Sequence, residues 1–329
     1  MQRPSNFTLL ASLLLAAVAA ISLSAQTAPL RLVSTPWAPF TNETEPRFAL
    51  DLVEAGLGRI NLKATTTIVE PARFTPSLLS NAFDGSAAAW KDPERESALV
   101  FSQPYLENRL ILVGRRDEDV SAASITALKG KRIAIVEGYA YGEGITTSGA
   151  TLVPSRSEED SLAQLLGNKA DYVLMDDLVV QFIVDNYPDQ AKTRLSVGTK
   201  PLLTRPLYFA LRKTYPNAAT IISRFNAQLR GMIADKTYHR LLHVTWIRAD
   251  IDGDGIPEYI PQSDKAGAVQ PQHAYSLFAS SSAAEGQQRF YYGGTIYTDW
   301  ATVPNRYKAE DPRHPDSERS TASIFRFVW

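Results

Sequence analysis

The sequence predicts a two-lobed α/β protein, and three observations lead to that prediction. The chain has 329 residues, enough for about two domains at ~150 residues each. Short β-like runs alternate with helix-like runs after residue 29, which is typical of α/β layers with largely parallel strands. Hydrophobic residues make up 44% and charged residues 21%, close to globular averages, which argues against a disordered or fibrous chain.

The first lobe is predicted from an alternation that ends in a charged stretch. The expected elements are a strand at 30–34, a helix at 48–57, a strand at 64–69, a helix at 72–81, and strands at 85–90 and 109–113. Residues 114–119 are Gly-Arg-Arg-Asp-Glu-Asp, which cannot continue a buried strand, so a first boundary is expected there.

A second α/β unit follows this boundary. Its expected elements are a short helix at 125–130, a strand at 132–136, a helix at 161–166, a strand at 171–175 and a helix at 178–187. Pro188 stops that last helix. A strand at 207–211 leads into a helix at 218–234, whose apolar residues recur at spacings of three and four, and a shorter helix at 238–246 ends the set.

These boundaries divide the mature chain into lobe 1 (26–116 with 204–247) and lobe 2 (117–203). The chain would leave lobe 1 near residue 116 and return near residue 204. Two such crossovers would act as a hinge, and the cleft between the lobes is the natural place for a ligand.

The amino terminus predicts export. Residues 1–25 contain Arg3, an apolar run from Leu9 to Ile21 and small residues at the end, in the order of a cleavable secretory signal. The apolar run of about 13 residues is shorter than the ~20 that span a bilayer, although a retained anchor helix is the alternative. We therefore expect a periplasmic protein.

Charge and cysteine content exclude several classes of site and partner. Lys plus Arg total 34 and Asp plus Glu total 35, so the formal net charge of -1 argues against a nucleic-acid partner. The absence of cysteine excludes disulfides, thiolate zinc sites, cysteine nucleophiles and a lipid-anchor cysteine.

Six ordered motifs resemble one known family, the bacterial extracellular solute-binding proteins of the polar amino acid type (family 3). The motifs are Trp37-Ala-Pro-Phe40, Phe48-Ala-Leu-Asp51, Asp92-Pro-Glu-Arg95, Phe101-Ser-Gln-Pro-Tyr105, Leu128 to Gly138 and Leu165 to Asp176. They cover residues 30 to about 247. The resemblance implies a two-lobed type II periplasmic binding fold, here with a C-terminal extension.

The resemblance also implies which residues hold a ligand. The family's Arg at the position of Arg95 holds an α-carboxylate, for which a guanidinium fork is well suited. The family's carboxylate at the position of Asp176 takes an α-ammonium group, while Asp177 would cap the next helix. Gly138 and Tyr139 stand where the family binds the carboxylate, although Tyr139 replaces a hydroxyl residue. The alternatives are a surface Arg95 paired with neighbouring glutamates, a capping Asp176 and a simple turn at Gly138.

Further cleft residues are expected among the aromatic and basic side chains. Trp37, Phe40, Trp90 and Tyr105 lie at strand ends or loops that should converge on the cleft. Phe40 and Tyr105 fit core packing equally well. Trp90 stands where the family has a small hydroxyl residue, which indicates an aromatic amino acid, a related carboxylate or a less zwitterionic ligand. Arg73 is a second candidate cation, with surface placement as the alternative.

An acidic loop at 248–261 is a candidate calcium site. Asp250, Asp252, Asp254 and Glu258 occupy positions 1, 3, 5 and 9 of a calcium loop. Position 12 is Pro261, so the loop is not a full EF-hand, and a solvated acidic turn is the alternative. Residues 262–329 are expected to form a polar linker and an aromatic C-terminal extension. No cofactor other than a possible Ca²⁺ is implied.

The function expected from these features is ligand binding without bond chemistry. The ligand would be an amino acid or a related small carboxylate, delivered to a membrane permease of an ABC importer. One alternative is a calcium-dependent interaction or sensor protein on the same fold. Another is a periplasmic dehydratase-like enzyme, with Glu137 or Glu143 as the cleft acid or base.

Overall fold

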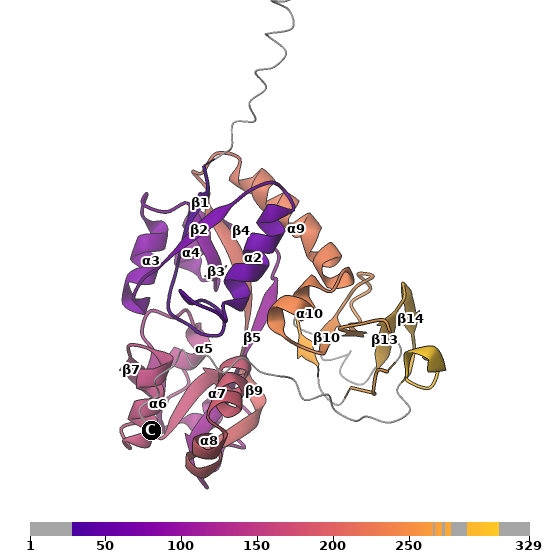
Figure 1. Ribbon diagram of the computed structural model, residues 1–329. Helices are drawn as coiled ribbons and strands as arrows, with labels where there is room; N and C mark the ends of the chain where they lie inside the picture. Colours follow the sequence, from indigo (N-terminus) through magenta and orange to yellow (C-terminus); the bar gives the residue numbers. More distant parts are fainter. Residues whose placement is uncertain (1–27, 266, 272–273, 278–287, 309–329) are drawn as a thin grey trace, which may run out of the picture.

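A computed structural model of the chain describes residues 28–265, 267–271, 274–277 and 288–308. The predicted signal at 1–25 and the aromatic end at 325–329 lie outside this range. Figure 1 shows two lobes, one above the other, and a C-terminal module to one side of the hinge between them. Within the described residues no helix combines the length and apolarity needed to cross a bilayer.

Lobe 1 is a twisted sheet with helices on both faces. Its elements are β1 (Leu30–Ser34), α2 (Phe48–Gly58), β2 (Ala64–Ile68), α3 (Pro71–Leu79), β3 (Gly85–Ala89), α4 (Pro93–Ala98), β4 (Leu99–Phe101), α9 (Ala218–Ala234) and α10 (Thr237–Leu242). Strand β1 lies parallel to β2 and β3. The predicted apolar face of α9 is confirmed, since Ile222, Phe225 and Leu229 are buried.

Lobe 2 repeats this arrangement in the middle of the chain. Its elements are β5 (Leu106–Arg115), the 3-10 helix η1 (Ile125–Leu128), β6 (Arg132–Val136), α5 (Glu143–Thr146), β7 (Thr151–Ser155), α6 (Glu158–Leu166), β8 (Tyr172–Asp176), α7 (Asp177–Asn186), α8 (Pro188–Arg194) and most of β9 (Leu195–Arg212). Strands β7, β6 and β8 are parallel, β5 lies antiparallel beside β8, and β9 lies antiparallel on the other side of β5.

The hinge is built on the long strand β9. Its first part pairs with β5, as far as Leu207, and its last part pairs with β3 and β4 of lobe 1. Because β8 and β9 are the strands that pair with β5 in the described part of the chain, β5 belongs to the sheet of lobe 2. The predicted exit from lobe 1 at residue 116 is therefore about ten residues too late. The charged run after β5 marks the end of a strand in lobe 2 and not the hinge.

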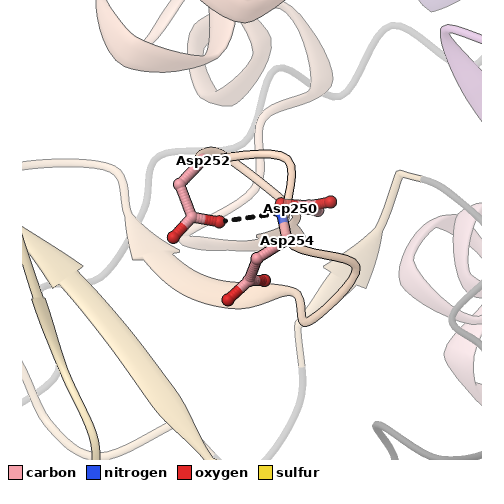
Figure 2. Close-up of side chains that lie close together, drawn as sticks. All are labelled: Asp250, Asp252 and Asp254. Atoms are coloured by element: carbon pink, nitrogen blue, oxygen red, sulfur yellow. Dashed lines mark hydrogen bonds between the residues drawn. The ribbon is translucent and has the colours of Figure 1, made fainter.

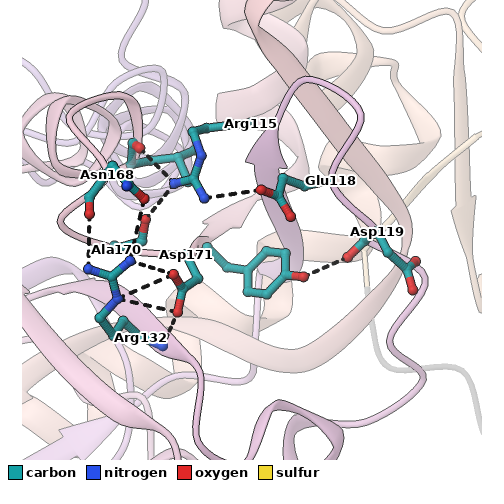
Figure 3. Close-up of polar contacts among 9 residues, drawn as sticks. Arg115, Glu118, Asp119, Arg132, Asn168, Ala170 and Asp171 are labelled. Carbon is teal, nitrogen blue, oxygen red and sulfur yellow. Dashed lines mark hydrogen bonds and ion pairs between the residues drawn. The ribbon is translucent and has the colours of Figure 1, made fainter.

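A polar network ties the edges of lobe 2 together (Figure 3). Arg132 at the start of β6 donates to both carboxylate oxygens of Asp171 just before β8. Arg115 at the end of β5 donates to the carbonyl oxygens of Leu165 and Ala170 and contacts Glu118. These contacts give the charged stretch after β5 a structural role within the lobe.

The C-terminal module is a second sheet, with the order β12-β10-β11-β13-β14. Its strands are β10 (Trp246–Ala249), β11 (Glu258–Pro261), β12 (Tyr275–Ser276), β13 (Arg289–Tyr292) and β14 (Thr295–Tyr297), followed by the 3-10 helix η3 (Asn305–Tyr307). Aromatic residues form its small core around Trp246, Phe290 and Tyr292. The predicted linker beginning at residue 262 is thus wrong in part, because Tyr275 and Leu277 are buried.

The module is docked on lobe 1 and on the hinge. Nε2 of the buried His239 in α10 lies 2.8 Å from the Ile260 carbonyl oxygen of β11. The Tyr275 hydroxyl donates to the carbonyl oxygen of Glu107 on β5 at 3.0 Å. The module therefore contacts one of the two strands that form the hinge.

Two glycines of α2 provide a matched test of the packing between α2 and α9. A Cβ at Gly56 would lie 2.5 Å from the Phe225 ring, whereas a Cβ at Gly58 would meet nothing within 4 Å. Phe225 cannot easily move, because it packs against Tyr105 and Phe209. We predict that Gly56→Ala destabilises the protein by about 1–3 kcal/mol through overpacking, whereas Gly58→Ala is neutral or slightly stabilising.

Equilibrium urea unfolding, followed by circular dichroism, measures both variants. Equal unfolding midpoints for the two variants would show that α2 and α9 do not pack as described.

Candidate functional site at the lobe interface

The two lobes meet through the segment that follows β6. Gly138 has a left-handed φ of 83°, and a Cβ there would lie 2.6 Å from the carbonyl oxygen of Pro71 in lobe 1. Only a residue without a side chain permits this approach. Helix α5 begins only at Glu143 and has four residues, so the residues directly after Gly138 are not helical.

An aromatic cluster fills the contact between the lobes, and we define it as Trp37, Trp90, Tyr139 and Tyr141. The two tryptophans come from loops after β1 and β3 of lobe 1, and the two tyrosines come from lobe 2. Ring centroids lie 5.5 Å apart for Trp37 and Tyr139 and 5.6 Å apart for Trp90 and Tyr141. The tilted and edge-on geometries are those that aromatic quadrupoles favour.

Arg95 is buried where the cluster meets α4, with 3% of its surface exposed. Its Nη1 donates to the Trp90 carbonyl oxygen at 3.0 Å, and its Nη2 donates to Thr75 Oγ1 at 2.7 Å. A longer bond of 3.4 Å runs from Nη2 to the carbonyl oxygen of Gly138 in the other lobe. The guanidinium therefore joins the two lobes.

Asp92 holds Arg95 in this position. Its side chain caps α4 by accepting from the Arg95 backbone N–H at 2.8 Å, and its Oδ2 lies 3.2 Å from Arg95 Nε. Burial lowers the pKa of the Arg95 guanidinium, while Asp92 and Glu94 oppose that shift. The group stays charged because an arginine pKa starts above 12. A buried positive charge with one partly exposed counter-ion is well placed to take an anion.

Asp176 is the buried N-cap of α7 and is fully enclosed. Its oxygens accept from Asn108 Nδ2, from the Arg109 backbone and from the Leu178 backbone. The expected division of roles, with Asp177 as the cap, is wrong, because Asp177 instead pairs with Arg109. Burial, assisted by the charge of Asp177, raises the pKa of the Asp176 carboxyl.

A hydrogen-bonded relay links the two predicted ligand residues. Trp90 Nε1 donates to Asn108 Oδ1 at 2.8 Å, and Asn108 donates in turn to Asp176. Since the Trp90 carbonyl accepts from Arg95, the relay runs from the guanidinium of one lobe to the carboxylate of the other. The role of Asp176 toward a ligand stays a prediction.

The remaining predicted cleft residues lie elsewhere. Tyr105 belongs to the core of lobe 1, where its hydroxyl donates to the Ala87 carbonyl and its ring packs on Phe225. Phe40 is also fully buried, and its ring packs against the Trp37 ring with the centroids 4.6 Å apart. Arg73 is exposed on the first turn of α3. The packing alternatives for Phe40 and Tyr105, and the surface alternative for Arg73, are therefore the ones observed.

Comparison with known proteins decides the family. The family model for bacterial extracellular solute-binding proteins, family 3, matches residues 32–248, about two thirds of the chain. This chain belongs to that family. The match spans both lobes and ends at β10, so most of the C-terminal module lies beyond it.

Relatives of this solute-binding protein include amino acid binding proteins. It is 26% identical over 219 residues to "ABC transporter arginine-binding protein 1" of Escherichia coli (strain K12), covering 64% of this chain and 86% of that relative. An ancestral arginine-binding protein bound to arginine superimposes with a TM-score of 0.56 at 21% identity, covering 66% and 98% of the two chains. An arginine 3rd transport system periplasmic binding protein from Legionella pneumophila gives 0.55 at 22% identity, with coverages of 66% and 99%. The predicted family and fold are confirmed.

Four residues of the site were not predicted from the sequence. Thr75 contacts Arg95, Asn108 contacts Asp176 and Tyr141 contacts Trp90. Apart from their polarity, nothing in the local sequence indicates that these three residues belong to the site. Arg205 lies on β9, donates to the Lys91 carbonyl and stands 5.7 Å from the Trp90 ring. The sequence pattern that could have indicated Arg205 is its position between Thr204 and Pro206, where the chain is predicted to return to lobe 1.

The acidic loop of the solute-binding protein brings three carboxylates together (Figure 2). Ligand atoms of Asp250, Asp252 and Asp254 lie within 4.8 Å of one another, as oxygens around a calcium ion at 2.3–2.6 Å would. Arg289 of β13 pairs with Asp252, Asp254 and the buried Glu258. The residues fit a calcium ion, but Arg289 already neutralises part of their charge, and calcium binding stays a prediction.

We predict weak calcium binding that Arg289 opposes. Calcium should raise the thermal unfolding midpoint of the chelator-treated protein only at roughly 10⁻⁴–10⁻³ M, the range of extracellular modules. Arg289→Gln should tighten this binding about tenfold, because it removes a competing cation, and Asp252→Asn should weaken it. Differential scanning fluorimetry with CaCl₂, and with MgCl₂ as the control, measures the midpoints. A midpoint that calcium leaves unchanged in both the parent protein and Arg289→Gln would assign the loop to a solvated turn.

Proposed function

We propose that this solute-binding protein is the periplasmic substrate-binding component of an ABC importer for an amino acid or a related small carboxylate. The observation that carries this proposal is the buried Arg95, whose guanidinium spans the contact between the lobes. The positions that the family resemblance assigns to ligand binding thus supply the positive charge of Arg95, the rings of the aromatic cluster and, from the opposite lobe, the backbone at Gly138.

The long hydrogen bond from Arg95 to Gly138 marks the side of the guanidinium that a carboxylate could occupy. Its bond to Gly138 is the longest of the three side-chain hydrogen bonds and is the one that opening of the hinge would break. A carboxylate could then take the free side of the fork, and charge-assisted bonds to it would replace a weak bond to a neutral carbonyl. Closure would return Gly138 to the ligand and shield the new ion pair from water.

Trp37 offers a second group for a ligand. Its Nε1 is buried and has no hydrogen-bond partner among the described residues. An indole N–H in that state normally finds an acceptor, and burying it without one is unfavourable. A ligand oxygen that reached Trp37 Nε1 would satisfy this donor, which supports a ligand with an oxygen acceptor such as a carboxylate.

The relatives support the transport role. The E. coli relative is named as part of an ABC transporter, and a protein of this kind hands its ligand to a membrane permease. Delivery requires a protein outside the membrane, which agrees with the predicted cleavable signal at 1–25. The proposal therefore includes export to the periplasm and a permease partner.

The enzyme alternative has little support in the geometry. Its two candidate residues, Glu137 and Glu143, are exposed. A general acid or base would instead need a position within reach of a bound substrate. A sensor role would use the same closure, and the contact of the C-terminal module with β5 is compatible with it.

The test is isothermal titration calorimetry with the 20 common amino acids, using the parent protein, Arg95→Lys and Arg73→Ala. We expect at least one amino acid to bind. Arg95→Lys should weaken it by about tenfold to a hundredfold, because lysine keeps the charge but loses the bidentate fork. The exposed Arg73→Ala is the matched control and should bind as the parent does. Absence of binding by every amino acid, or unchanged affinity in Arg95→Lys, would contradict the proposal.

A further inference from the structure

Glu158 is a buried carboxylate that neither the motifs nor the cleft geometry described so far have used. It is the first residue of α6, in lobe 2, and 7% of its surface is exposed. Its Oε2 is buried and has no hydrogen-bond partner within the described parts of the chain. Leaving a carboxylate oxygen enclosed and unsatisfied is costly, so such a group requires an explanation.

The charged neighbours of Glu158 are themselves acidic. The two charges that act on it most are Glu159, next to it on α6, and Asp176 at the end of β8. Asp176 already accepts three hydrogen bonds, all from protein groups. Nothing in this set compensates the charge of Glu158, and a cation brought in by a ligand would compensate it.

Glu158 lies beside the lobe 2 half of the aromatic cluster. Strand β7 ends beside β6, with Ser155 opposite Val136, so the start of α6 and the segment with Tyr139 and Tyr141 leave the same edge of the lobe 2 sheet. The rings of these tyrosines face Trp37 and Trp90 across the lobe contact. The faces of tryptophan and tyrosine rings attract ammonium and guanidinium groups. In the closed arrangement these rings meet directly, so a ligand would enter after the lobes part and would lie between the two pairs of rings.

We propose that Glu158 pairs with a positively charged side-chain group of the ligand, so that the ligand class is amino acids with an ammonium or guanidinium side chain. This inference rests on the proposed function, which supplies Arg95 for the carboxylate. The ligand's far end is then held by Glu158 and by rings of the aromatic cluster. Glu158 acts as a specificity-determining residue in this arrangement.

Proton linkage follows from the environment of Glu158. Burial, with Glu159 and Asp176 next in importance, raises its pKa to about 8. The free protein at pH 7 therefore holds Glu158 largely protonated. A bound cation favours the ionised form and lowers this pKa, so binding releases a proton and the affinity rises with pH from 6 to 8. Asp176 also has a raised pKa and shares this response, whereas Tyr139 and Tyr141 stay protonated because burial raises their pKa values.

The experiment compares the parent protein with Glu158→Gln and Glu159→Gln. The probes are L-arginine, L-lysine and L-glutamine, titrated by calorimetry into the full exported chain at pH 7.5. We expect the parent to bind arginine or lysine at least thirtyfold more tightly than glutamine. Glu158→Gln should lose at least tenfold in affinity for the cationic amino acid and stay within threefold for glutamine. The matched control Glu159→Gln, one residue away on the same helix turn, should stay within threefold for all three probes.

A second readout separates a direct contact from a structural effect. Titrations in buffers of different ionisation enthalpy should show proton release on arginine binding by the parent protein, and less than half as much by Glu158→Gln. Urea unfolding of Glu158→Gln should give an unchanged or higher midpoint, since the substitution replaces a buried carboxyl group, whose ionisation is unfavourable, with a neutral amide of the same size. A lower midpoint together with equal losses for all three probes would assign Glu158 a structural role and overturn the inference.

The outcomes distinguish this inference from the proposed function. If L-glutamine or L-glutamate binds the parent most tightly, or if Glu158→Gln keeps its affinity for arginine, the inference fails while the binding function stands. If no amino acid binds the parent protein, the binding function fails and the inference falls with it.

Discussion

A single buried guanidinium connects most of the features of this protein. Arg95 costs free energy to enclose, and the surrounding structure offsets that cost with the Trp90 carbonyl, Thr75, Asp92 and the Gly138 carbonyl. Three of these partners belong to lobe 1 and one belongs to lobe 2. The guanidinium is therefore held in position by its own lobe, and its last hydrogen-bond partner comes from the other lobe. Closure of the hinge completes the hydrogen bonding of Arg95.

The sequence predicted the parts of the site that depend on local order. Arg95, Trp37 and Trp90 belong to motifs with fixed spacing next to strand ends, so their convergence could be expected. Glu158, Asn108 and Tyr141 could not be found in this way, because their importance arises only from contacts between segments that are far apart in the chain. Asp176 was identified, but its role as the cap of α7 was assigned to its neighbour, since two adjacent aspartates look alike without backbone geometry.

The fold shows the same division between local and distant information. The alternating strands and helices were predicted because their apolar patterns are local. The hinge was placed about ten residues too late, because the pairing of β5 with β8 is a long-range property. The polar sequence after residue 262 predicts a linker and not the two-residue strand β12, because pairing with β10 and burial of Tyr275 are long-range contacts. Through Tyr275 of that strand, the C-terminal module contacts β5 of the hinge directly. Movement of the lobes would therefore change the surroundings of the module.

The central claim is that the lobes close around a ligand held by Arg95, and the most direct measurement is the distance between the lobes in solution. The chain has no cysteine, so spin labels can be placed at two introduced cysteines, Ala82→Cys after α3 and Gln190→Cys on α8, both exposed. Double electron-electron resonance should give a broad distribution without ligand and a narrower, shorter one with a saturating concentration of the amino acid that the parent protein binds most tightly. In Arg95→Lys the same change should need a tenfold to a hundredfold higher concentration of that amino acid. Identical distributions with and without that amino acid in the labelled parent protein would contradict the account.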